Sequence, residues 1–86
     1  MPTTEGLTLL RQDVNSVRCD ALFASGLQPS DAPTAEMVAR AINRMVRQFG
    51  TGGCTGRMAQ EFGDHPDMAA KRMRWVRQLV QVADRT

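Results

Sequence analysis

The stretch RMAQEFGDHPDMAAKRM, residues 57–73, decides the fold of this chain. Apolar residues recur at intervals of three and four on both sides of its centre, which is the period of an amphipathic helix. Gly63 is a stop for the first helix, Asp64 is a cap for the second, and Pro66 and Asp67 suit the second helix's first turn. The stretch therefore predicts two helices joined by a short turn.

The same period extends over the rest of the chain, and no segment alternates apolar and polar residues as a half-buried strand does. We therefore expect an all-α protein of four helices. The last three helices are expected to form a trihelical core, and the first to pack across them or to reach a second copy. The predicted helices cover residues 5–25, 34–50, 55–62 and 64–83, with loops at 26–33 and 50–54 and a flexible tail at 1–4.

Size and composition exclude several classes of protein. The chain has 86 residues, is 42% hydrophobic and 23% charged, and carries a formal charge of +2. A chain this short forms one domain with a thin core and has no room for a cofactor-binding α/β domain. No apolar run reaches the ~18–20 residues of a membrane-spanning helix, and the first residues do not resemble a signal peptide. With two cysteines only, we expect a cytoplasmic protein without a membrane partner.

On two of the predicted helices, the apolar residues occupy more of the helix surface than one thin core obviously needs to bury. On the helix at 64–83 they span roughly half of the circumference, and the helix at 5–25 carries apolar residues on two sides. One interpretation is that both helices are packed on two sides within the fold. The other is a homodimer or a second protein, because oligomerisation often completes a thin core. The residues expected at such an interface are Leu9, Phe23, Trp75, Leu79 and Val82.

The stretch 57–73 resembles a helix-turn-helix of small bacterial regulatory proteins. Ala59 stands at the small position where the two helices of such a motif cross, and Gly63 stands at the turn. The resemblance implies that the second helix lies in the major groove of DNA. A plain helical hairpin is the alternative, because it uses the same glycine and the same small residue. The hydrophobic contacts of the motif correspond to Met58, Phe62, Ala69 and Met73.

The resemblance also implies which side chains contact DNA. Residues 33–86 hold nine basic against five acidic residues, whereas residues 1–32 hold two against four, so the positive charge lies with the motif. We expect a non-enzymatic regulatory protein that binds DNA as a dimer. The alternatives are a solvated basic face and a small helical adaptor that binds another protein. The base contacts would be His65, Asp67, Ala70, Lys71 and Arg74, and the phosphate contacts Arg40, Arg44, Arg47, Arg57 and Arg77.

Other motifs indicate no chemistry. The glycine-rich segment 50–56 follows no strand and lacks the terminal Lys-Ser/Thr of a nucleotide loop. Asp64, His65 and Asp67 lack the spacing of a zinc site. Cys54 is expected to be a small buried residue; the alternatives are a reactive thiol at a helix N-terminus and, in an oxidising compartment, a disulfide to Cys19. We therefore expect no catalytic residues, no metal and no cofactor.

Arg72 is the one cation placed in the middle of an apolar arc. A guanidinium there needs a partner, and a carboxylate is the usual one. We expect an ion pair within the hairpin region, or a contact across an interface as the alternative. The candidate carboxylates are Glu61, Asp20 and Asp13.

Overall fold

The part of the chain that the structure describes is helical apart from short connections. The computed structural model describes residues 15–85, and no strand occurs among them, which confirms an all-α protein. A 3-10 turn, η1, lies within the predicted loop at 26–33. The elements are a helix over residues 15–24, η1 (Pro29–Asp31), α2 (Ala35–Asp64) and α3 (Pro66–Arg85).

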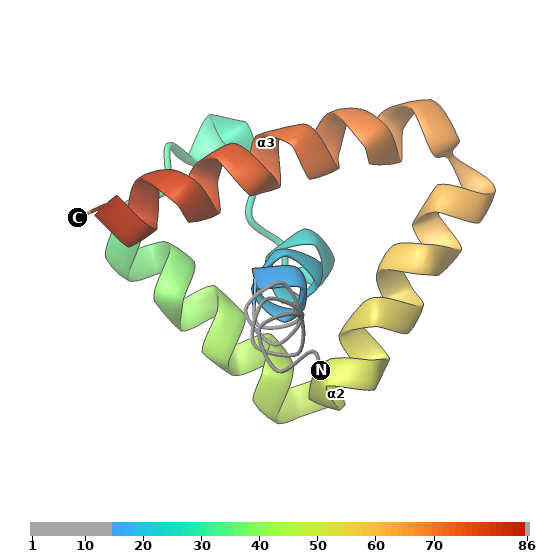
Figure 1. The fold of residues 1–86 in the computed structure, drawn as a ribbon, viewed down its shortest axis with the longest axis horizontal. Helices are drawn as coiled ribbons and strands as arrows, with labels where there is room; N and C mark the ends of the chain where they lie inside the picture. Colours follow the sequence, from blue (N-terminus) through green and yellow to red (C-terminus); the bar gives the residue numbers. More distant parts are fainter. Residues whose placement is uncertain (1–14, 86) are drawn as a thin grey trace, which may run out of the picture.

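The helix over residues 15–24, which we call the central helix, lies in the middle of the fold. In Figure 1 the two halves of α2 and the whole of α3 form the sides of a triangle, and the central helix is seen end-on inside it. Its residues Ala21, Leu22 and Phe23 are 0%, 0% and 4% exposed. The expectation that the first helix packs across a core made by the others is therefore wrong, because this helix is the centre of that core.

The hydrophobic core draws on every helix of the described chain. The central helix supplies three residues, the first half of α2 four, and α3 another four, while Cys54 comes from the second half of α2. The side chains around the central helix therefore converge on it from three directions. The buried hydrophobic residues are Ala21, Leu22, Phe23, Val38, Ala41, Ile42, Met45, Cys54, Ala69, Met73, Val76 and Val80.

The second and third predicted helices are joined end to end in α2, so residues 15–85 contain three helices rather than four, and the predicted end of the second helix at residue 50 coincides with a kink in α2. The predicted loop at 50–54 is wrong, because residues 51–54 are helical and only Gly50 leaves the helical conformation, with φ 71° and ψ 170°. Cys54 is fully buried, and Thr55 Oγ1 donates a hydrogen bond to the Asp20 carboxylate at 2.8 Å. These contacts with the core and the central helix favour helix where glycine's low propensity predicted a loop.

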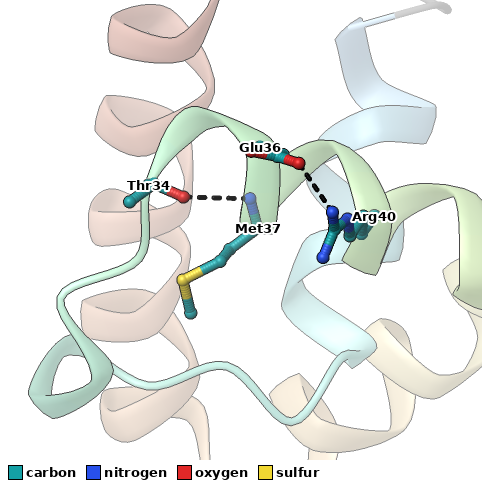
Figure 2. Close-up of polar contacts among 4 residues, drawn as sticks. All are labelled: Thr34, Glu36, Met37 and Arg40. Carbon is teal, nitrogen blue, oxygen red and sulfur yellow. Dashed lines mark hydrogen bonds and ion pairs between the residues drawn. The ribbon is translucent and has the colours of Figure 1, made fainter.

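The start of α2 follows the prediction. The Thr34 side chain caps the helix by accepting a hydrogen bond from the backbone N–H of Met37 at 3.2 Å (Figure 2). Glu36 lies in the first turn, where a negative charge is favourable at a helix N-terminus. The cap of α2 thus coincides with residue 34, where the helix was predicted to begin.

A single residue, His65, joins α2 to α3. Its backbone N–H donates to the Glu61 carbonyl at 2.7 Å, and its own carbonyl accepts from the N–H of Ala69 at 2.8 Å. Pro66 occupies the first position of α3, as predicted. The prediction that Gly63 stops one helix and Asp64 caps the next is wrong, because α2 runs through both residues to Asp64.

Candidate nucleic-acid interface

The basic side chains that are predicted to contact DNA are all exposed. Four of them lie on α2, three lie on α3, and His65 lies between the two helices. Exposure is the first requirement for contact with a phosphate backbone. The α2 residues are Arg40, Arg44, Arg47 and Arg57, and the α3 residues are Lys71, Arg74 and Arg77.

Three of these arginines share one surface. Arg40, Arg44 and Arg47 follow one another at intervals of four and three, which places them on one side of α2. Together with Asn43 and Gln48 they border a shallow, open hollow. We call these five residues the α2 arginine face. The two amides were not predicted, although Asn43 follows Arg40 by three residues and Gln48 follows Arg44 by four.

Arg40 is partly neutralised by its own helix. Its guanidinium forms an ion pair with the Glu36 carboxylate one turn earlier, at 2.6 Å (Figure 2). Both side chains are about three-quarters exposed, so the pair contributes little stability and an incoming phosphate can compete for the arginine. Arg44 and Arg47 form no ion pair with an acidic residue in the described part of the chain. The α2 arginine face therefore carries a net positive charge.

The other predicted cations lie on separate surfaces. The Arg57 guanidinium stacks on the Phe49 ring, with Cζ 3.8 Å from the ring centroid, and Arg57 borders a cavity that it shares with Arg72. Arg77 borders a different hollow, together with Cys19 of the central helix. Lys71 and Arg74 are exposed on α3. The structure thus brings together three of the predicted contacts and distributes the rest.

The helical hairpin at 57–73 places most of its apolar residues as predicted. Ala69 and Met73 are buried, and Met58 and Phe62 pack against the core while half-buried. Ala59 is exposed, so the prediction that it stands at the crossing of the two helices is wrong. The reason is the position of the central helix, since Phe62 stacks on Phe23 at 5.8 Å between ring centroids and the hairpin's inner face is filled by that helix.

The residues predicted for a dimer or partner interface separate into three groups. Phe23 is a core residue, which corrects the expectation that it faces a partner. Trp75 and Leu79 are half-buried against the core, whereas Val82 is 59% exposed. Leu9 lies outside the described residues. Of the four predicted residues that the structure describes, Val82 is therefore the one that is exposed to solvent.

Arg72 is held by backbone carbonyls rather than by a carboxylate. Its Nε donates to the Phe23 carbonyl at 2.9 Å, and its Nη2 donates to the Ser25 carbonyl at 2.9 Å and the Leu22 carbonyl at 3.5 Å. The predicted ion pair with Glu61 or Asp20 is absent from the described residues, and Asp13 lies outside them. Arg72 thus caps the C-terminal end of the central helix, where carbonyls lack helical partners and a cation is favourable.

Comparisons of the chain with family models, curated proteins and solved structures give no match. None of the described helices is both long enough and apolar enough to span a membrane. The described residues also contain no group of three or more His, Cys, Asp or Glu side chains arranged to hold a metal ion.

The two cysteines are free thiols. Cys54 is fully buried, as predicted, and Cys19 is half-buried. Burial raises the pKa of the Cys54 thiol, the nearby Asp20 carboxylate raises it further, and Arg57 opposes both effects. A thiol with a raised pKa is a poor nucleophile, so Cys54 is suited to packing rather than to chemistry.

Proposed function

We propose that this protein is a non-enzymatic regulatory protein of the cytoplasm that binds duplex DNA as a dimer. The α2 arginine face contacts the phosphate backbone, and the exposed side of α3 that carries Lys71 and Arg74 lies toward the bases, with His65 beside it. The observation that carries the proposal is the α2 arginine face. It groups three guanidinium groups and two amides on one exposed helix surface.

The chemistry of the α2 arginine face suits phosphates. A guanidinium presents a planar set of donors that matches two phosphate oxygens at once, and amide side chains also donate to phosphates. From Arg40 to Arg47 the face extends about 10 Å along the helix axis, at 1.5 Å per residue. Several phosphates can therefore be contacted together, and each contact releases a counterion from the DNA.

Fluorescence anisotropy with a labelled random-sequence duplex at several salt concentrations tests the proposal. We expect binding that weakens steeply as salt increases, because counterion release supplies the affinity. The double substitution Arg44→Gln with Arg47→Gln removes four phosphate contacts from the dimer, so it should reduce the magnitude of the slope of log K against log salt by about 3.6, at about 0.9 per contact.

A matched control removes the same charge elsewhere. Arg57→Gln with Arg77→Gln takes two charges from two other surfaces, so it should change the slope by less than the Arg44 and Arg47 pair. Negligible binding at low salt would refute DNA binding. Equal losses in both double variants would show that overall charge, not the α2 arginine face, attracts the DNA.

A protein-binding adaptor is the second candidate, and one observation favours it. An apolar groove runs between the start of α2 and the end of α3, lined by Ala35, Val38, Leu79 and the exposed Val82. Val82→Gln distinguishes the two candidates. If the groove binds a different protein, this substitution abolishes partner binding and leaves the molar mass and the DNA affinity as in the wild type, whereas loss of a DNA-binding dimer would lower both the molar mass and the DNA affinity.

A further inference from the structure

A cavity of about 370 Å³ lies where three elements of the fold meet. The central helix contributes Phe23 and Ala24 at its C-terminal end, the second half of α2 contributes a polar wall, and α3 contributes Arg72. In Figure 1 the central helix lies inside the angle that the second half of α2 makes with α3. The α2 arginine face is not part of the cavity, because it lies on the first half of α2. The polar wall consists of Arg57, Gln60 and Glu61.

Arg72 brings to this cavity a cation whose hydrogen bonds within the protein leave one amino group open to solvent. A guanidinium has five N–H donors, and the three carbonyls of the central helix engage only Nε and Nη2. The Nη1 group has no hydrogen-bond partner among the described residues, and no carboxylate there lies within ion-pair distance of Arg72. Burial lowers the pKa of Arg72 and the more distant Glu61 raises it, so a close negative charge would stabilise this cation.

Arg57 supplies a second cation on another wall of the same cavity. Its guanidinium lies over the Phe49 ring at 3.8 Å, which fixes the plane of the group and leaves its edge donors for other partners. Arg57 forms no ion pair with an acidic residue in the described chain. Two guanidinium groups from different helices therefore border one cavity.

We propose that this cavity binds the oxyanion of a small organic monoanion, with Arg57 and Arg72 as its ligands. A carboxylate or a phosphate monoanion offers oxygens that a guanidinium binds in pairs. Glu61 balances one of the two positive charges, so the lining favours a ligand with one negative charge over a multiply charged one. Phe23 and Ala24 provide an apolar contact for the organic part. This site is independent of DNA binding and would add a small-molecule ligand to the protein.

Nuclear magnetic resonance of the ¹⁵N-labelled protein tests the site directly, because the arginine Nε–Hε groups report on their own surroundings. The probes are benzoate and phenyl phosphate, with neutral benzamide as the control, all at constant ionic strength. We expect saturable shifts of the Arg57 and Arg72 Nε–Hε signals with benzoate and none with benzamide. Phenyl phosphate distinguishes the two oxyanions, and it should bind better at pH 5.5, where it is a monoanion, than at pH 8.

Substitutions then assign the contacts. Arg57→Gln should raise the Kd for benzoate about tenfold, the size expected for losing one charge-assisted contact of about 1.4 kcal/mol. Arg44→Gln removes the same charge from the α2 arginine face and should change that Kd by less than twofold. Glu61→Gln should allow the phenyl phosphate dianion to bind at pH 8.

Two results would overturn the proposal. One is the absence of saturable shifts at Arg57 and Arg72 in the folded wild-type protein. The other is an equal response at Arg44 and Arg47, which would show nonspecific attraction of the anion to arginines. DNA binding measured by anisotropy is a separate outcome, so the failure of either proposal leaves the other testable.

Discussion

The chain changes direction at the C-terminal end of the central helix and at the bend in α2. Different interactions fix the backbone at these two places. At the central helix, residues 21–23 are buried, Ser25 Oγ donates to the Leu22 carbonyl at 2.6 Å, and Arg72 donates to the same carbonyl and to those of Phe23 and Ser25. At the bend, Gly50 alone changes the direction of α2, and no atom lies within 4 Å of where its Cβ would be.

The difference shows that a turn can be fixed by contacts from far along the chain or by local backbone freedom. The end of the central helix depends on groups that lie 47 to 50 residues away in sequence. The bend depends on the left-handed conformation that glycine adopts at little cost. Substitutions should therefore affect the first site through lost hydrogen bonds and the second through backbone strain.

The largest expected effect is at Arg72. Arg72→Met keeps most of the side-chain length but removes the Arg72 donor from the Phe23 and Ser25 carbonyls, whereas the Leu22 carbonyl still accepts from Ser25. We expect the free energy of unfolding to fall by about 2–4 kcal/mol, the range for losing charged hydrogen bonds to partly buried groups. Urea denaturation measures it. Arg74→Met is the control on the same helix, and its exposed side chain should cost at most about 0.5 kcal/mol. Equal losses in the two variants would contradict the capping role.

The next effect is at Gly50. Gly50→Ala meets no atom, so its cost is the backbone strain of an L-residue at φ 71° and ψ 170°. We expect a loss of about 1–3 kcal/mol in the free energy of unfolding, the cost of a conformation that is nearly exclusive to glycine. Gly26→Ala also meets no atom and has no positive φ, so it should be nearly neutral in the same denaturation experiment.

A smaller effect of opposite sign is expected just after the bend. Gly56 lies within the helical second half of α2 with open space around it, so Gly56→Ala should stabilise the protein by about 0.5–1 kcal/mol through helix propensity. In Gly53→Ala the new Cβ would lie 3.0 Å from the Phe49 Cβ, and this contact should reduce or reverse the gain. Thermal unfolding of the two variants compares them. A larger gain at position 53 would contradict the close packing of Phe49 there.

The smallest effect concerns pH, through the thiol that packs beside the central helix. The pKa of Cys54 is raised in the folded protein, so folding favours the neutral thiol. Its contribution to stability is complete below the unfolded pKa of about 8.5 and is lost as pH rises toward the folded pKa. The urea midpoint should therefore fall between pH 7.5 and 9.5. Cys54→Ala should flatten this decline, and an unchanged slope would show that another group causes it.

Local signals in the sequence predicted the local structure well. Thr34 marked the start of α2 because a side-chain cap is a property of a few adjacent residues, and the helical period identified the buried positions of Val38, Ala69 and Met73. The burial of Cys54 followed from the general behaviour of a free thiol. The clustering of Arg40, Arg44 and Arg47 also followed from spacing alone.

The long-range features were not predictable in the same way. The glycines at 50–56 favoured a loop, and only the contacts of Cys54 and Thr55 with the rest of the fold explain why residues 51–54 are helical. The partners of Arg72 are backbone carbonyls, which every residue has, so no pattern of side chains could identify them. The position of the central helix likewise depends on the bend at Gly50, which determines how α2 surrounds it.

The hydrogen bonds of Arg72 affect the order in which the parts of the fold can form during synthesis. During synthesis the central helix leaves the ribosome before α2 and α3, yet the groups that hold its C-terminal end are made 47 to 50 residues later. Contacts of such separation form only after a long loop has closed, which slows folding. The central helix is therefore made before α2 and α3 and is among the last to be fixed, and in a nascent chain that ends before Arg72 its C-terminal carbonyls lack these hydrogen-bond donors.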